Sequence, residues 1–317
     1  MPDFNTITLS DEVRAAINAG RPVVALESTL LAHGLSYPAN IELAREVDAI
    51  VRDAGAVPAT VAVIRGLPTI GLDDEAMAIL TQNPGISKLS ARDLAIAMGT
   101  GIDGATTVAS TAALAAAVGI SVFATGGLGG VHRDARESFD ESADLATLAR
   151  APIVVVCAGV KSLLDISATL ERLESLNVAV AGYRTNRFPG FYRRDSGYPV
   201  DWSLDNVTSV ARVAHARTAL RRSGVAGADG ALVLANPLPE GSELDASVHD
   251  EALASGLAEA ARLGIRGKAV TPFLLGHFHA ATGGESLRVN LEIIRRTARL
   301  AAEIAVAIAV AIAKDGR

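Results

Sequence analysis

Residues 154–166, VVVCAGVKSLLDI, decide the fold class of this chain. The apolar run at their start is typical of a buried β-strand, and the pattern after it predicts a helix from about residue 161 to residue 175. A buried strand followed by a helix is the repeating unit of a parallel sheet. The stretch also places an amine, that of Lys161, where the apolar chain meets a loop.

The same alternation of strand and helix extends along most of the chain. Strands are predicted at 22–26, 59–64, 120–125, 152–158, 177–183 and 230–237, with a short hairpin partner at 66–72. Helices are predicted near 11–19, 40–54, 73–82, 106–117 and 206–222, then near 243–263, after 271–272 and after 282–286. We expect an α/β fold of three layers, α/β/α, with a mixed, mostly parallel central sheet. No repeat or linker divides the chain, so residues 1–317 are expected to form a single domain with a helical C-terminal part.

Composition restricts the classes of partner. Half of the 317 residues are apolar, which is enough for a sizeable core, and the net charge of −6 disfavours nucleic acid and anionic membranes as partners. A local basic pocket for a phosphate remains compatible with this charge. The single cysteine, Cys157, lies inside an apolar run and is expected to be a small core residue in a reducing cytoplasm.

Two terminal segments bear on localisation. The N-terminal sequence MPDFNTITLSDEV has neither a basic region nor an apolar core, so we expect no secretory leader. The tail ARLAAEIAVAIAVAIAK is interrupted by Glu303 and is shorter than the ~20 apolar residues of a membrane span. It is expected to be a buried or subunit-packing helix.

Three polar features follow predicted strands. Glu27 follows the strand at 22–26, the glycine-rich loop at 125–134 follows the strand that begins at 120, and Lys161 follows the strand at 152–158. Loops after parallel strands converge at one edge of a sheet, so these groups are expected to meet there. A partly desolvated Lys161 amine would suit Schiff-base chemistry, although a lysine at such a position, taken alone, is more often a solvated residue. Glu27 is either an acid in a pocket or a carboxylate near a helix N-terminus.

Other motifs leave alternatives open. The segments GIDGATTVAS and TGGLGGVHR fit neither the P-loop nor the dinucleotide fingerprint, so ATP and NAD are not indicated, and their glycines suit turns and close packing as well as a phosphate. In FDESADL, Asp140, Glu141 and Asp144 offer oxygen ligands suited to Mg²⁺ or Mn²⁺. Asp140 and Asp144 would share a helix face, so one could hold a metal while the other faces substrate; the alternative is a solvated helix start. His132 suits substrate binding or a plain loop role. Lys88, predicted in a loop, is a phosphate-directed charge or a surface lysine.

Several long motifs together resemble one known family. They are ALESTLLAHGLSYPAN, VPATVAVI, KLSARDL, GATTVAST, VFATGGLGGVHR, SADL, VVCAGVKSLLDI, NPLPE, VTPFLL and TGGESLRVN, in order over a core of about 22–305. They resemble the pseudouridine-5′-phosphate glycosidases, also called the indigoidine synthase A-like family. The resemblance implies a homotrimer that reversibly splits pseudouridine 5′-phosphate into uracil and ribose 5-phosphate. It implies Mn²⁺ or another divalent cation, and neither NAD, ATP nor PLP.

The resemblance also implies roles for individual residues. Lys161 would be the nucleophile that attacks the ribose anomeric carbon, and Glu27 the proton donor that opens the ring and yields a Schiff base. Asp140 would bind the metal. Substrate contacts are implied for Lys88, Thr107, Val108, His132, Ser142, Ala143, Asp144 and Asn290. One departure is Glu141, where the family pattern leads us to expect isoleucine; pointing inward it would alter metal binding, and pointing outward it would be neutral.

Two other functions remain as alternatives. One is a Schiff-base sugar-phosphate lyase of the aldolase type, which would use the same lysine on another substrate. The other is a non-catalytic homologue that binds a nucleotide or a protein. A silent homologue is expected to lack the lysine or the acid, whereas Glu27 and Lys161 are both present.

Overall fold

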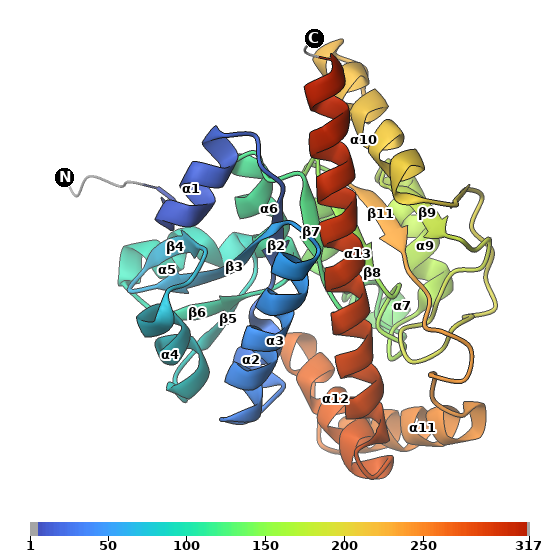
Figure 1. The fold of residues 1–317 in the computed structure, drawn as a ribbon. Helices are drawn as coiled ribbons and strands as arrows, with labels where there is room; N and C mark the ends of the chain where they lie inside the picture. Colours follow the sequence, from blue (N-terminus) through green and yellow to red (C-terminus); the bar gives the residue numbers. More distant parts are fainter. Residues whose placement is uncertain (1–5, 316–317) are drawn as a thin grey trace.

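The apolar runs of the sequence form one sheet. The computed structural model describes residues 6–315, and their strands follow the order β1-β4-β3-β2-β7-β8-β11-β9-β10, with β6 pairing with β3 and β5 with β6 (Figure 1). The strands are β1 Thr8–Leu9, β2 Val23–Leu26, β3 Val57–Ile64, β4 Leu67–Ile70, β5 Ser87–Leu89, β6 Gly104–Thr106, β7 Val122–Ala124, β8 Val154–Cys157, β9 Ala179–Tyr183, β10 Ser203–Leu204 and β11 Leu232–Ala235.

Most neighbouring strands run parallel, as predicted. The central strands β3, β2, β7, β8, β11 and β9 run parallel to one another. β3 pairs antiparallel with β4, which confirms the hairpin expected at 66–72, and also with β6. β2, β7, β8 and β11 are buried along their whole length, which explains why their sequences show continuous apolar runs rather than alternation.

Helices cover both faces of the sheet and complete the three predicted layers. One core lies between the sheet and α1, α6, α8 and α9, and the other between the sheet and α3, α4, α10 and α13. The helices are α1 Asp11–Asn18, α2 Thr29–His33, α3 Ala39–Asp53, α4 Asp74–Gln82, α5 Leu94–Thr100, α6 Val108–Ala117, α7 Ala135–Ser138, α8 Ala143–Leu148, α9 Ile166–Ser175, α10 Val207–Arg222, α11 Ala246–Arg262, α12 Val270–Ala281 and α13 Glu285–Asp315.

The alanine-rich tail forms the long helix α13, which crosses one face of the sheet (Figure 1). It packs on α3, α10 and the strands β2, β7 and β8. Its buried residues include Ala301, Ala302 and Ile304, so the prediction of a buried helix is confirmed for this part of the tail. Within residues 6–315 no helix combines the length and the apolar character needed to cross a membrane.

Cys157, at the end of β8, is fully buried. Burial raises the pKa of its thiol to about 12, so the thiolate is disfavoured at neutral pH. The prediction that this cysteine is a core residue is confirmed. The N-terminal segment on which the leader expectation depends lies partly outside the described residues, and so do the two ends of the predicted domain, 1–317.

Three local predictions are wrong. The helix after β8 begins at Ile166 rather than near residue 161, because Asp165 caps it by accepting a hydrogen bond from the Ala168 N–H at 3.0 Å. Lys88 lies in strand β5, paired with β6, and not in a loop.

The third error concerns Asp140 and Asp144, which do not share a helix face. Ser142 is the N-cap of α8, so Asp144 lies in the first turn and Asp140 precedes the helix. The Ser142 hydroxyl accepts a hydrogen bond from the Asp144 N–H at 3.2 Å, which fixes the start of the helix after Asp140.

Candidate active site

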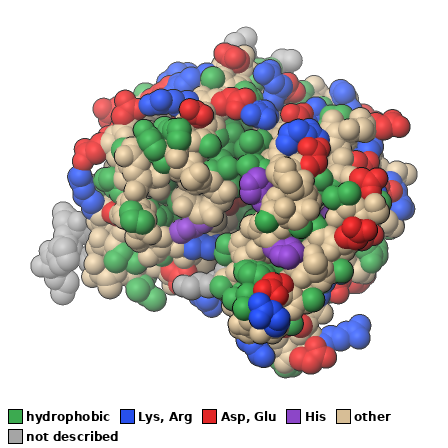
Figure 2. Space-filling model, turned by 90° about the horizontal axis from the view of Figure 1, so that it is seen from below, with side chains coloured by type: hydrophobic (Ala, Val, Ile, Leu, Met, Phe, Trp, Pro, Cys, Tyr) green, Lys and Arg blue, Asp and Glu red, His purple; other side chains and the backbone are tan. Residues whose placement is uncertain are grey.

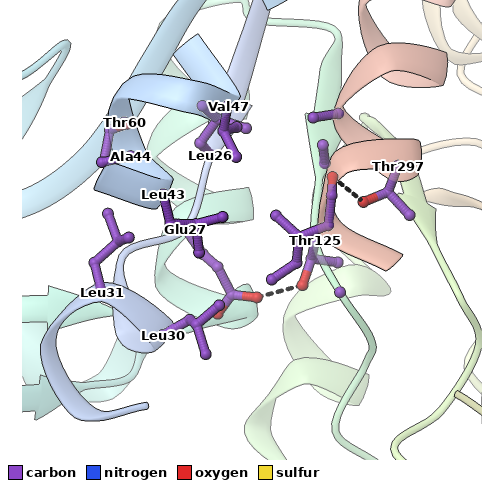
Figure 3. Close-up of a pocket in the computed structure, with 14 residues that line it drawn as sticks. Leu26, Glu27, Leu30, Leu31, Leu43, Ala44, Val47, Thr60, Thr125 and Thr297 are labelled. Atoms are coloured by element: carbon purple, nitrogen blue, oxygen red, sulfur yellow. Dashed lines mark hydrogen bonds between the residues drawn. The ribbon is translucent and has the colours of Figure 1, made fainter. Parts of the chain in front are cut away.

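Strand register brings Glu27 beside Thr125. Leu26 at the end of β2 is paired with Ala124 at the end of β7, and each strand continues by one residue, to Glu27 and to Thr125. The Thr125 hydroxyl donates a hydrogen bond to Oε1 of Glu27 (Figure 3). Both residues thus stand at the carboxyl end of the sheet, the edge at which α/β proteins bind ligands.

Glu27 lies at the wall of a largely apolar cavity of about 60 Å³. The apolar side chains come from β2, α2, α3, β7 and α13, and Figure 3 labels several that line the same cavity as Glu27: Leu26, Leu30, Leu31, Leu43, Ala44 and Val47. Burial raises the pKa of Glu27. A carboxyl group in such surroundings keeps its proton at higher pH than an exposed one, which a general acid requires.

Charged neighbours modify this effect. The charge of Lys161, the Thr125 hydrogen bond and the charge of Lys88 lower the pKa of Glu27, whereas the charge of Asp144 raises it. Because these charges act on one carboxyl group, the sequence prediction that Glu27 and Lys161 share one edge of the sheet is supported by the fold.

A hydroxyl network fixes the backbone just after Glu27. The Ser28 hydroxyl donates to the Val61 carbonyl at 2.6 Å and accepts from the Thr106 N–H at 2.9 Å. The Thr29 hydroxyl donates to the Thr106 carbonyl at 2.8 Å. The turn between β2 and α2 is therefore tied to β3 and β6, and Glu27 has a rigid support.

Lys161 occupies an extended segment beyond β8 rather than a helix. Its N–H donates to the Leu128 carbonyl at 3.0 Å, and the Leu128 N–H donates to the Gly159 carbonyl at 2.9 Å. The glycine-rich loop thereby continues the pairing of β7 with β8 past the end of both strands. Gly159 has φ of +87°, and a Cβ there would collide with the Pro189 carbonyl, so this path requires glycine.

Asp144 is a buried carboxylate that joins two parts of the site. Its Oδ1 accepts from the Ala109 N–H in the first turn of α6 at 2.9 Å, and its Oδ2 accepts from the Gly129 N–H at 2.8 Å. A Cβ on Gly129 would lie 2.6 Å from Oδ2, so glycine permits the contact. For Gly129 the close-packing alternative is therefore correct, and its N–H binds Asp144 instead of a phosphate.

Other predicted substrate residues lie on elements that reach this edge. Thr107 caps α6 through a reciprocal pair with Ser110, and Val108 is the first residue of that helix. Asn290 on α13 is buried, with its Oδ1 3.5 Å from where a Cβ on Gly126 would stand. Ser142 caps α8, which begins at Ala143. Their substrate contacts stay predictions.

His33 is one functional candidate that sequence reasoning missed. It ends α2, and burial and the nearby charge of Lys88 lower its pKa, which places it beside a predicted substrate residue. Figure 2 views the molecule from below and shows histidine side chains around a depression in which a basic side chain is visible.

Thr125 was also missed as an individual residue. Thr125 is the first residue after β7, just as Glu27 is the first residue after β2. This shared position at a strand end could have marked Thr125 as a site residue. Recognising it requires knowing that β2 and β7 are neighbours.

Asp140 and His132 form the part of the site that suits a cation. Oδ2 of Asp140 lies 3.7 Å from Nδ1 of His132, and the His132 N–H donates to the Asp140 carbonyl. Among the described side chains, no group of three or more His, Cys, Asp or Glu is arranged around a metal site. Mg²⁺ and Mn²⁺ are often bound by one or two carboxylates with water as the remaining ligands, so Asp140 fits such an ion.

Glu141 points away from Asp140. Its Oε2 accepts from Nε of Arg172 at 2.9 Å, and the pair is partly exposed. Of the two orientations considered for this departure from the family pattern, the structure has the outward one.

Comparisons with known proteins agree on one family. A family model described as indigoidine synthase A like protein matches residues 12–307. The chain is 60% identical to a pseudouridine-5′-phosphate glycosidase of Salinispora tropica, over 92% of this chain and 89% of that protein. It is 54% identical to one of Frankia alni, over 96% of this chain and 82% of the relative.

Solved structures are similar over nearly the whole chain. The crystal structure of the prealnumycin C-glycosynthase AlnA in complex with ribulose 5-phosphate matches with a TM-score of 0.89 and 36% identity, covering 99% of this chain and 100% of that one. An indigoidine synthase A-like protein from Thermotoga maritima matches with a TM-score of 0.85 and 34% identity, covering 96% and 97%.

Proposed function

Because the chain belongs to the indigoidine synthase A-like family, we propose that it is an enzyme that cleaves the C–C glycosidic bond of pseudouridine 5′-phosphate, releasing uracil and ribose 5-phosphate. The names of the relatives support this substrate. The observation that carries the proposal to this chain is the position of Glu27, a carboxyl group at an apolar cavity at the carboxyl end of β2, while Lys161 follows β8 at the same edge of the sheet and is held by the loop that continues β7.

The chemistry calls for an amine and an acid. A C-glycoside has no leaving nitrogen or oxygen to protonate, so the scheme of two carboxylates used by most glycosidases does not suit it. In the proposed reaction the free amine of Lys161 attacks C1′ of the ribose. The bond from C1′ to the ring oxygen breaks, and Glu27 gives its proton to that oxygen.

The open-chain adduct then loses uracil. Uracil C5 gains a proton, the electron pair of the C1′–C5 bond restores the C5=C6 double bond, and the nitrogen lone pair forms a protonated imine between Lys161 and C1′. Water hydrolyses this imine, releases ribose 5-phosphate and regenerates the amine. The net reaction consumes one water.

Other residues bind rather than react in this proposal. Lys88 faces an anionic part of the nucleotide, and the first turn of α6 at Val108 offers backbone N–H groups. Asp140, whose carboxylate lies 3.7 Å from Nδ1 of His132, would hold a divalent cation, Mn²⁺ or a related ion. Such an ion supplies positive charge that stabilises anionic groups of the substrate.

A trapping experiment tests the covalent step. The protein is incubated with ribose 5-phosphate and Mn²⁺ and reduced with borohydride, and the modified peptide is located by mass spectrometry. We expect the adduct on Lys161 and none in Lys161→Ala. An adduct on another lysine, or one that persists in Lys161→Ala, would contradict the assigned nucleophile.

Uracil release tests the substrate. Activity on pseudouridine 5′-phosphate should greatly exceed activity on uridine 5′-phosphate, whose bond is a C–N bond. Equal rates would remove the C-glycosidase proposal.

Asp140→Ala should abolish stimulation by Mn²⁺, and stimulation that survives this change would refute the metal site. Sedimentation of the native protein tests the proposed homotrimer.

A further inference from the structure

We infer that Thr125 is the positioning residue of the proton donor: its hydroxyl binds Oε1 of Glu27 and leaves Oε2 as the oxygen that carries the proton to the substrate. This inference rests on the proposed function, because it takes Glu27 as the acid. The contact of the Thr125 hydroxyl with Oε1 alone carries it, since a hydroxyl that donates to a carboxyl group binds the oxygen that lacks the proton.

The backbone of Thr125 is held by the sheet. Its N–H donates to the Val156 carbonyl of β8 at 3.0 Å, and the residue is only 3% exposed. Glu27 is held equally firmly through Ser28 and β2. The contact between the two side chains therefore joins two fixed points, as the positioning of an acid requires.

The two oxygens of a protonated carboxyl group differ. One is a carbonyl oxygen that accepts hydrogen bonds, and the other carries the hydrogen and donates. A hydroxyl that donates to Oε1 favours the form in which Oε1 is the carbonyl oxygen. The proton then resides on Oε2, which does not bind Thr125.

The same contact adjusts the proton affinity of Glu27. A hydrogen bond donated to the carboxylate stabilises its charged form, and the Thr125 bond lowers the pKa of Glu27 against the larger effect of burial. Thr125 thus affects both the orientation of the Glu27 proton and the pKa of Glu27. The two effects can be measured separately.

The chain offers a matched control in Thr297. This threonine lines the same cavity from α13, yet its hydroxyl donates to the Ile294 carbonyl of its own helix at 3.1 Å (Figure 3). Thr297→Val therefore removes a hydroxyl from the cavity wall without removing a bond to Glu27. Thr125→Val is nearly isosteric, and Thr125→Ser restores the donor.

The test measures uracil release from pseudouridine 5′-phosphate as a function of pH for the four proteins. In Thr125→Val we expect kcat to fall about 10-fold to 100-fold with little change in KM. Activity of a general acid falls as the pH rises above its pKa, and this fall is the high-pH limb of the profile. In Thr125→Val the high-pH limb should move to higher pH, because the pKa of Glu27 rises when the donor is lost. Thr125→Ser and Thr297→Val should retain the wild-type limb.

A second measurement needs no substrate. The Glu27 pKa is read from the carboxyl ¹³C signal of labelled protein, assigned with Glu27→Gln. It should rise in Thr125→Val alone. An unchanged pKa in Thr125→Val, or an equal rise in Thr297→Val, would overturn the inference, whereas an inactive wild-type protein would count only against the proposed function.

Discussion

At the scale of single residues, the neighbours of Glu27 have opposing effects on the pKa of its carboxyl group. Burial next to an apolar cavity and the charge of Asp144 favour protonated Glu27, whereas Lys161, Thr125 and Lys88 favour its carboxylate form. Asp144 has a second task, since its two oxygens bind the backbone of α6 and of the glycine-rich loop.

Replacing Asp144 should therefore have two consequences. In Asp144→Asn the negative charge that raises the pKa of Glu27 is lost, so the high-pH limb of the activity profile should move to lower pH, opposite to Thr125→Val. The amide can accept with only one oxygen, so one backbone donor loses its partner and we expect a loss of about 1–3 kcal/mol of unfolding free energy. Rate profiles against pH and denaturant titrations measure the two effects. A limb that moves to higher pH would contradict this electrostatic role.

Asp48 on α3 links stability to pH. Burial raises its pKa to about 6, against the attraction of Arg52, and its buried Oδ1 lacks a hydrogen-bond partner. Because the folded-state pKa lies above the unfolded one, Asp48 destabilises the fold above about pH 6, and this penalty disappears as the pH falls below about 4. Asp48→Asn should raise the unfolding free energy by about 1–3 kcal/mol at pH 8 and have little effect at pH 4. Urea unfolding at both values tests this, and a gain that is equal at both would refute it.

At the scale of elements, α13 contributes both to the core and to the cavity wall. Ile304 is fully buried in its middle, and Ile312 is 60% exposed near its end. Ile304→Ala should cost about 2–5 kcal/mol of unfolding free energy, because the cavity it leaves cannot collapse between helix and sheet. Ile312→Ala, the same chemical change in the same helix, should stay within about 0.5 kcal/mol. Thermal or urea unfolding compares them, and similar losses would show that the C-terminal end of α13 is also packed.

The elements themselves were largely predictable from the sequence. Continuous apolar runs and capping residues identified β2, β7, β8 and most helices, since these signals are local. Failures occurred where a distant partner decides the local structure. Residues 158–161 pair with the glycine-rich loop and so begin α9 late, and Lys88 is drawn into a strand by β6.

The sequence predicted where the site lies and what chemistry it suits, but it identified only some of the residues that form the site. Position after parallel strands was enough to group Glu27, Lys161 and the glycine-rich loop. Thr125 could not be selected, because its role depends on strand order and on the register Leu26–Ala124, neither of which the sequence displays. The double use of Asp144 was hidden for the same reason, since its partners Ala109 and Gly129 come from α6 and from the glycine-rich loop.

At the scale of the whole molecule, the fold gathers the predicted site residues from widely separated parts of the chain. Glu27 comes from β2, Lys161 from beyond β8 and Asn290 from α13. The family match over residues 12–307 spans all of them, so a truncation that removes α13 should remove both a predicted substrate contact and a wall of the Glu27 cavity.

The pairing of Glu27 with Thr125 also has a consequence in time. The two residues are 98 positions apart, and their contact requires β2 and β7 to be neighbours in correct register. Contacts between distant segments form late, because chain entropy is lost before they are made. During refolding from denaturant, helical circular dichroism should recover before catalytic activity. Recovery of catalytic activity would then report the late pairing of β2 with β7 during folding.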